Sequence, residues 1–146
     1  MKELRTEIEI DAEPKKTWNI LMDFENWQDW NPIVNQVKGT ATVGSKLVVT
    51  MCDNHGKDAQ RYMPSVTNLE PPKYFRWRAQ MMASFMFTND KVFELEEIPN
   101  GTRLIHREEF SGLLVPLFWG KLKSGALPML NAMNKALKLA AEQSSN

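Results

Sequence analysis

The spacing of apolar residues changes between the middle of this chain and its C-terminal part, and that change limits the folds it can adopt. Across residues 74–82, Phe75 and Trp77 alternate with arginines, which is the period of a half-buried β-strand. Nearer the C-terminus, apolar side chains recur every three or four positions, which predicts a long amphipathic helix over residues 117–142. A sheet with one apolar face and a helix with one apolar stripe can bury these surfaces against each other.

The rest of the chain fits further strands and two short helices. Strands are expected over residues 3–11, 35–40, 46–52, 58–69, 74–82, 85–98 and 102–110. Short helices are expected at residues 15–24 and around Trp27, and Pro128 falls inside the long helix. Short turns such as that at Gly101 indicate antiparallel pairing of successive strands. The predicted fold is α+β: a curved seven-stranded antiparallel sheet, built as one strand, two short helices and a six-strand meander, wrapped around the C-terminal helix.

The charge balance and the cysteine count exclude several classes of protein. The chain has 146 residues, and 18 Lys and Arg balance 18 Asp and Glu, whereas general nucleic-acid binders and polybasic membrane-surface proteins show a basic excess. The single Cys52 forbids an internal disulfide and fits a reducing, cytoplasmic compartment. The longest apolar run is far shorter than the ~20 residues that span a bilayer, so no membrane insertion is expected.

The length fits one domain. We expect that domain over residues 1–142 and a disordered tail over residues 143–146, while the oligomeric state stays open. Nine methionines and five tryptophans are many for this length, and such side chains shape adaptable apolar surfaces. For each one alone, ordinary core packing is the alternative to a place in a cavity wall.

Several short motifs in this order resemble the START/SRPBCC superfamily, whose helix-grip fold is that of the birch-pollen allergen, and its polyketide cyclase/dehydrase-like branch. The motifs are Ile10-Asp11-Ala12-Glu13-Pro14 with Trp18, Trp27-Gln28-Asp29-Trp30-Asn31-Pro32, Leu69-Glu70-Pro71-Pro72, Asn100-Gly101-Thr102-Arg103-Leu104 and Phe110-Ser111-Gly112. The resemblance implies a hydrophobic cavity under the long helix, which in that superfamily holds lipids, sterols, polyketides or hormones. Because one fold hosts many functions, it does not specify a reaction.

Periodicity and the resemblance together select the residues expected to line this cavity. They are Trp30, Met51, Arg61, Met63, Phe75, Trp77, Met81, Phe87, Leu104, His106, Phe110, Phe118, Leu122, Met129 and Met133. Arg61 is included as an inward cation that anchors a ligand carboxylate or phosphate. The other strand arginines are expected mostly on the solvent face.

His106 and Glu108 are the candidate catalytic residues, because positions i and i+2 of a strand point the same way. A His–carboxylate pair in an apolar pocket is suited to acid–base chemistry. Polar groups satisfied within the core are the alternative, and a register error of one residue sends both side chains outward.

The sequence leaves three classes of function open. Binding of a small hydrophobic molecule, such as a lipid or an aromatic polyketide, is ranked first. A cyclase or dehydratase that uses His106 and Glu108 is second, and a protein-interaction module with an exposed apolar patch is third. With only two histidines and one cysteine, no metal site and no cofactor are expected.

Overall fold

The computed structural model describes residues 1–81 and 83–143, and in that part of the chain the elements follow the expected order. The strands are β1 (Lys2–Ile10), β2 (Val34–Lys38), β3 (Val48–Cys52), β4 (Asp58–Tyr62), β5 (Ser65–Glu70), β6 (Tyr74–Met81), β7 (Phe87–Ile98) and β8 (Gly101–Ser111). The helices are α1 (Pro14–Met22), the 3₁₀ helix η1 (Phe24–Asp29) and α2 (Val115–Gln143). The α+β helix-grip class is therefore confirmed. Met82, expected at the end of a strand, lies outside the described residues.

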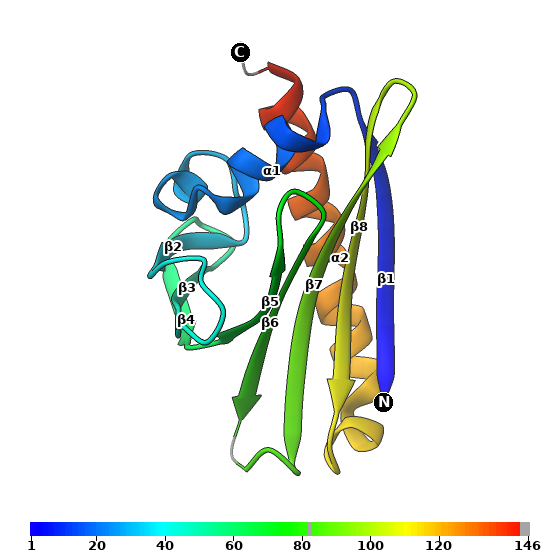
Figure 1. Cartoon of the computed structure of the whole chain (residues 1–146). Helices are drawn as coiled ribbons and strands as arrows, with labels where there is room; N and C mark the ends of the chain where they lie inside the picture. The colour runs from blue at the N-terminus through cyan, green and yellow to red at the C-terminus, as the bar shows by residue number, and fades with distance from the viewer. Residues whose placement is uncertain (82, 144–146) are drawn as a thin grey trace.

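The strands form two antiparallel sheets, which corrects the expected single sheet of seven strands (Figure 1). One sheet has the order β1-β8-β7-β6-β5 and the other β2-β3-β4. The single strand expected over residues 58–69 is divided at Met63 and Pro64 into β4 and β5. Because proline has no N–H for a ladder hydrogen bond, the chain leaves one sheet there and enters the other.

Strand β1 forms one edge of the larger sheet, where it pairs with β8, the last strand in the chain. In the β1–β8 register, Thr6 lies opposite His106 and Ile8 opposite Leu104, so their side chains share the inner face. The β7–β8 hairpin reaches β1 closely at Gly101, whose φ is +149°. A Cβ there would lie 2.1 Å from the carbonyl oxygen of Ile10, so only glycine fits.

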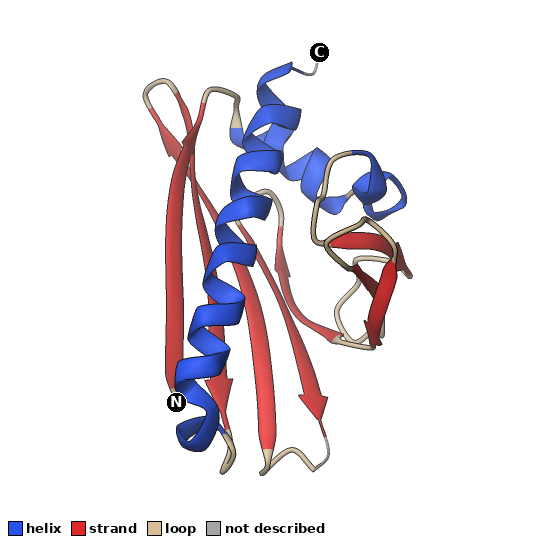
Figure 2. Cartoon of the chain, turned by 180° about the vertical axis from the view of Figure 1, so that it is seen from behind, coloured by secondary structure: helices blue, strands red, loops and turns tan. Residues whose placement is uncertain are grey.

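Helix α2 lies across the inner face of the larger sheet (Figure 2). Its own residues Leu130, Met133 and Leu137 are buried, at the helical spacing that the sequence predicts. The helix includes Gln143, which the sequence assigned to the tail, and residues 144–146 lie outside the described part. Within the described residues, no helix is long and apolar enough to cross a membrane.

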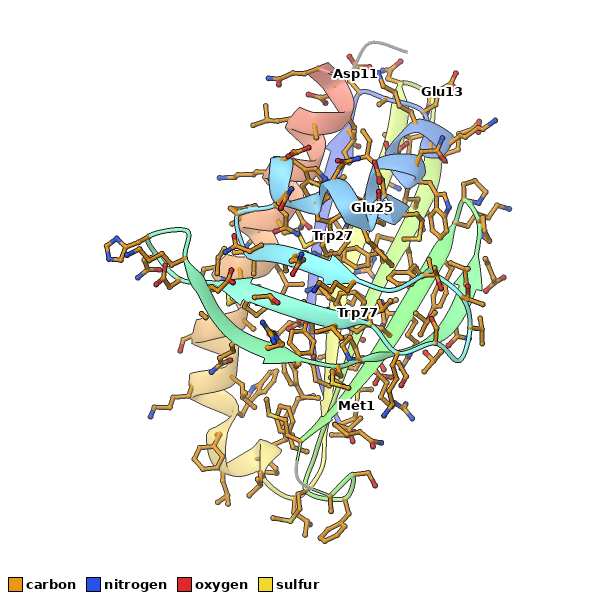
Figure 3. All side chains as sticks on the ribbon, turned by 90° about the vertical axis from the view of Figure 1, so that its left-hand side faces the viewer. Met1, Asp11, Glu13, Glu25, Trp27 and Trp77 are labelled. Atoms are coloured by element: carbon orange, nitrogen blue, oxygen red, sulfur yellow. The ribbon has the colours of Figure 1, made fainter. Side chains whose placement is uncertain are left out.

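An aromatic core fills the space between α1, η1 and the larger sheet. Trp27 and Trp77, both labelled in Figure 3, have ring centroids 6.1 Å apart, and the Trp27 indole donates a hydrogen bond to the carbonyl of Leu21 at 2.8 Å. Along β6, Phe75 and Trp77 belong to this core, and Ala79 beyond them lines a cavity. Core and cavity are thus successive parts of one inner face.

The outer face of the larger sheet carries paired charges. The Asp90 carboxylate accepts hydrogen bonds from Arg76 Nη2 at 2.6 Å and from Arg78 Nε at 2.8 Å. On the neighbouring strand, Arg107 Nη2 binds Glu94 at 2.7 Å. The arginines expected on the solvent face are there, held in ion pairs by acidic residues of adjacent strands.

Candidate functional site

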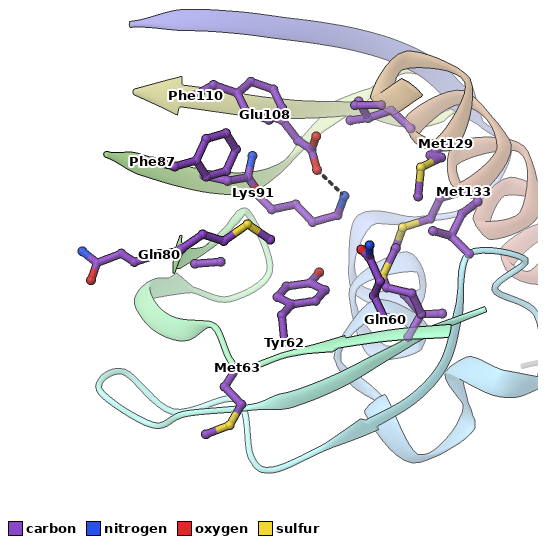
Figure 4. A pocket seen from close by; sticks show the side chains of 18 residues that line it. Gln60, Tyr62, Met63, Gln80, Phe87, Lys91, Glu108, Phe110, Met129 and Met133 are labelled. Atoms are coloured by element: carbon purple, nitrogen blue, oxygen red, sulfur yellow. Dashed lines mark hydrogen bonds and ion pairs between the residues drawn. The ribbon is translucent and has the colours of Figure 1, made fainter. Parts of the chain in front are cut away.

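A cavity of about 240 Å³ lies between the larger sheet, the smaller sheet and α2 (Figure 4). This volume is close to the lower end of the range of small-molecule sites, roughly 300–1,000 Å³. Its walls are Ile33, Val34, Met51, Gln60, Tyr62, Met63, Ala79, Gln80, Met81, Phe87, Asn89, Lys91, Glu108, Phe110, Ala126, Met129, Leu130 and Met133.

Methionines from separate elements form much of the apolar wall. Met51 comes from β3, Met63 follows β4, Met81 ends β6, and Met129 and Met133 project from α2. In Figure 4 the side chains of Met129 and Met133 come down from the helix towards the space above Tyr62. Flexible thioether side chains can repack around ligands of different shape. Part of the methionine surplus in the sequence is therefore accounted for by this wall.

One ion pair lies in the wall of this cavity. Lys91 on β7 stands opposite Glu108 on β8, and Lys91 Nζ lies 3.1 Å from Glu108 Oε1. Their side chains are only 13% and 14% exposed. The Lys91 ammonium also lies 5.7 Å from the ring centroid of Phe93. The cavity therefore offers a ligand a largely desolvated charge pair with no net charge.

Tyr62 and Asn89 add hydrogen-bond donors beside this pair. Burial, and secondarily the charge of Glu108, raises the pKa of the Tyr62 hydroxyl well above its usual value, so the phenol stays protonated. In Figure 4 the Tyr62 hydroxyl points into the space next to Lys91 and Glu108. The Asn89 Nδ2 group is buried and has no hydrogen-bond partner within the described residues. A buried donor of this kind is stabilised by a ligand oxygen.

His106 lies on the same inner face but belongs to the core. Its ring stacks on Phe93 at 4.3 Å, and its Nδ1 is 2.8 Å from Asn134 Oδ1. Asn134 Nδ2 in turn donates to Thr6 Oγ1 at 2.8 Å, so Asn134 Oδ1 is the acceptor and His106 Nδ1 carries the proton. Burial, with a contribution from the charge of Lys91, holds the pKa of His106 well below its usual value. The imidazole is thus a neutral link between α2 and the sheet.

The expected acid–base pair does not form. Glu108 is bound to Lys91, and His106 is bound to Asn134 and is absent from the cavity wall. The sequence identified the correct face for both side chains. It did not show that each has a different partner.

The structure brings together about half of the residues expected at the cavity. Those that line it are Met51, Met63, Met81, Phe87, Phe110, Met129 and Met133, with Glu108. Phe75, Trp77, Leu104 and His106 are instead fully buried in the core, because the aromatic rings of α1, η1 and β6 fill that end of the inner face.

The other expected residues lie outside the cavity for local reasons. Arg61 is exposed because its neighbours Gln60 and Tyr62 occupy the inward positions of β4, a phase error of one residue. Trp30 packs beside the main core, and Leu122 packs against a second apolar cluster near Phe110. Phe118 is half exposed at the start of α2.

Five polar residues of the site were missed: Lys91, Tyr62, Gln60, Gln80 and Asn89. The signal for Lys91 was present, since it alternates in phase with the inward residues Phe87, Phe93 and Leu95 of β7. A lysine in the apolar phase of a strand has to find a partner, and the partner is Glu108.

Two other kinds of chemistry-bearing group are the candidate metal ligands and the single cysteine. Within the described residues, no group of three or more His, Cys, Asp or Glu side chains is placed to hold a metal ion. The Cys52 thiol donates to the carbonyl oxygen of Pro32 at 2.9 Å, and burial, with the charge of Asp53, raises its pKa. The raised pKa disfavours the reactive thiolate form of Cys52.

Comparison with known proteins gives the family. The family described as polyketide cyclase/dehydrase and lipid transport matches residues 1–142. No match is found among curated proteins.

Solved structures support the same fold. Protein CV1439 from Chromobacterium violaceum is 15% identical with a TM-score of 0.77, and the alignment covers 99% of this chain and 100% of that one. A START superfamily protein from Mycobacterium smegmatis is 21% identical with a TM-score of 0.71, covering 97% of each chain. The di-domain ARO/CYC BexL of the BE-7585A biosynthetic pathway is 13% identical with a TM-score of 0.71, covering 99% of this chain and 51% of that one. The chain belongs to the polyketide cyclase/dehydrase and lipid transport family.

Proposed function

We propose that this protein binds a small, largely apolar molecule in the cavity between its sheets and α2. The observation that carries the proposal is the cavity itself, which has methionine and aromatic walls around a few convergent polar groups. That combination is typical of small-molecule sites, in which apolar walls supply affinity and a few polar groups supply orientation. Membership of a family described by polyketide chemistry and lipid transport is consistent with it.

The polar groups favour a ligand with an uncharged oxygen acceptor. Lys91, Tyr62 and the unpartnered Asn89 amide offer donors, whereas the main acceptor, Glu108, is already bound to Lys91. A ketone or ester oxygen can accept from these donors without adding charge. A ligand carboxylate would bring a second negative charge close to Glu108, which is unfavourable in a poorly solvated site.

The geometry favours binding over the acid–base reaction that the sequence suggested as an alternative. His106 is enclosed by Phe93 and Asn134, so no ligand in the cavity reaches its ring. Glu108 is engaged in an ion pair with Lys91, so it is not placed to act together with His106.

Binding is tested with pairs of compounds that share one carbon skeleton, such as 2-acetylnaphthalene and 2-naphthoate, or methyl decanoate and decanoate. Native mass spectrometry and thermal shifts are expected to show binding, with the uncharged member bound more tightly. A ligand at 100 times its Kd adds about 2.7 kcal/mol to stability.

A variant that fills the cavity provides the control. Ala126 faces the cavity and Asn131 is exposed on the same helix, so Ala126→Phe should abolish the ligand-induced shift and Asn131→Phe should keep it. Absence of any bound compound across the panel, or equal shifts in both variants, would overturn the proposed function.

A further inference from the structure

One end of the molecule exposes a group of large apolar side chains. Phe85, between β6 and β7, is 65% exposed; Leu113, between β8 and α2, is 68% exposed; and Leu117, in the first turn of α2, is 75% exposed. Met81 and Phe118 extend the group. We call these five residues the apolar tip. In Figures 1 and 2 it corresponds to the lower end, where β6 and β8 finish and β7 and α2 begin.

Backbone hydrogen bonds join the two segments that form the apolar tip. Leu113 N donates to the carbonyl of Phe85 at 3.0 Å, and Leu114 N donates to the carbonyl of Met86 at 3.1 Å. The exposed side chains therefore belong to one surface rather than to two separate loops. Contiguous exposed apolar surface of this kind commonly marks an interaction site.

The two segments that form the apolar tip carry charges of only one sign. Residues 79–89 contain no charged residue, and residues 110–141 contain four lysines and no Asp or Glu. Lys121 and Lys123 are exposed in the early turns of α2, and Lys121 follows Leu117 by four positions, so the two share a helix face. Lys2 at the start of β1 places its ammonium 5.9 Å from the Trp119 ring.

Carboxylates on the adjoining strands are paired with arginines and not with these lysines. Glu3 and Glu109 bind Arg107, and Asp90 binds Arg76, all on the outer face of the sheet. The whole chain is neutral, and this neutrality argued against a membrane-surface protein in the sequence. The charge at the apolar tip differs from this overall neutrality, because residues 110–141 carry lysines and no acidic residue.

We propose that the apolar tip docks the protein onto the surface of an anionic phospholipid bilayer. Exposed aromatic and leucine side chains enter the boundary between headgroups and acyl chains, while Lys2, Lys121 and Lys123 contact the anionic headgroups. This is attachment to the surface and involves no membrane-spanning segment. Met81 belongs to the apolar tip and also lines the cavity, so docking brings one residue of the cavity wall to the lipid surface.

A second copy of the chain fits the same surface less well. A symmetric dimer formed through the apolar tip brings the lysines of both copies together, with no free carboxylate in residues 110–141 to pair them. An anionic lipid surface supplies the opposite charge.

Sedimentation of the full chain with vesicles tests the proposal. Vesicles of phosphatidylcholine mixed with phosphatidylglycerol should bind the protein, phosphatidylcholine alone should bind it much less, and high salt should release it. The double variant Lys121→Gln/Lys123→Gln should weaken binding roughly 25-fold, at about fivefold per lysine. Phe85→Ser/Leu117→Ser should reduce it by a similar or larger factor.

Matched controls come from the opposite end of the same helix. Leu139 is 55% exposed and Lys135 is exposed, so Leu139→Ser and Lys135→Gln should leave vesicle binding unchanged. Melting curves establish that all variants are folded. Absence of binding, equal binding to neutral vesicles, or equal losses in the control variants would overturn the proposal. So would a concentration-dependent dimer that Phe85→Ser/Leu117→Ser disrupts while vesicle binding persists.

Discussion

Lys91 Nζ and Glu108 Oε1 lie 3.1 Å apart in the wall of the cavity, on residues that face each other across β7 and β8. Each side chain is largely withdrawn from water, so each charge depends on the other for its stabilisation. The pair also adjoins the space in which we place the ligand's polar end. Its energetics and its effect on ligand choice are therefore both measurable.

Removing one member of the pair should cost more stability than removing both. Lys91→Met leaves the Glu108 carboxylate unpaired, and we expect a loss of about 3–5 kcal/mol in the free energy of unfolding. The double variant Lys91→Met/Glu108→Gln should recover a large part of that loss. Urea unfolding of the wild type, Lys91→Met, Glu108→Gln and the double variant completes the cycle. The exposed pair Arg103–Glu96 is the control, since Arg103→Met should cost about 1 kcal/mol or less. Additive losses in the cycle would contradict a coupled pair.

Glu108→Gln should change which ligands the cavity accepts. The substitution keeps the shape of the side chain and removes the negative charge, so Lys91 becomes available to a ligand carboxylate. Affinity for 2-naphthoate should rise about tenfold or more, while that for 2-acetylnaphthalene changes little, given interactions of a few kcal/mol between close charges. Calorimetric titration of both compounds checks this. An unchanged ratio of the two affinities would mean that the pair does not contact the ligand, even if binding itself is found.

His106 should make the protein less stable in mild acid. Burial lowers its pKa in the folded state, so below the ordinary value of about 6.5 the unfolded chain binds a proton that the folded chain does not. Stability should therefore fall as the pH drops below about 6.5, by up to about 1.4 kcal/mol per pH unit. His106→Gln should remove this component from a series of melting curves between mild acid and neutral pH. His55→Gln, at an exposed turn, should keep it. Identical pH profiles for the wild type and His106→Gln would contradict the assignment.

Asp90→Asn should weaken the outer face of the sheet. Burial acts to raise the pKa of Asp90, but the hydrogen bonds and charges of Arg78 and Arg76 outweigh it and lower the pKa. The carboxylate thus stabilises the fold above its ordinary pKa of about 3.9 and loses that effect as the pH falls through its folded value. We expect the variant to be about 3 kcal/mol less stable at neutral pH, with a smaller difference in strong acid. Asp29→Asn, at an exposed position of η1, should change stability little. A deficit that stays constant with pH would indicate lost packing instead.

The order and type of the elements could be read from the sequence because they depend on local periodicity. The alternation around Phe75 and Trp77 and the helical spacing of Met129, Met133 and Leu137 each reflect one element facing one apolar surface. The break of the strand at Pro64 was missed, although proline is a local signal, because the flanking residues remain extended on both sides.

The composition of the site depends on contacts between distant residues. Inward orientation was correct for His106, Glu108, Phe75 and Trp77, yet only Glu108 reaches the cavity. Whether an inward side chain packs in the core or lines an open space depends on the volumes of the side chains opposite it, which come from α1, η1 and α2.

By itself, the sequence determined the α+β class, the inner face of each main strand and the apolar stripe of the last helix, since these follow from spacing along the chain. Only the tertiary structure decided that Glu108 pairs with Lys91 and His106 with Asn134, and where the cavity lies. It also decided that the exposed side chains of Phe85, Leu113 and Leu117 lie together at one end. The reason is physical: a face follows from local periodicity, whereas a partner, a void and a surface patch arise only when segments far apart in the sequence are brought together.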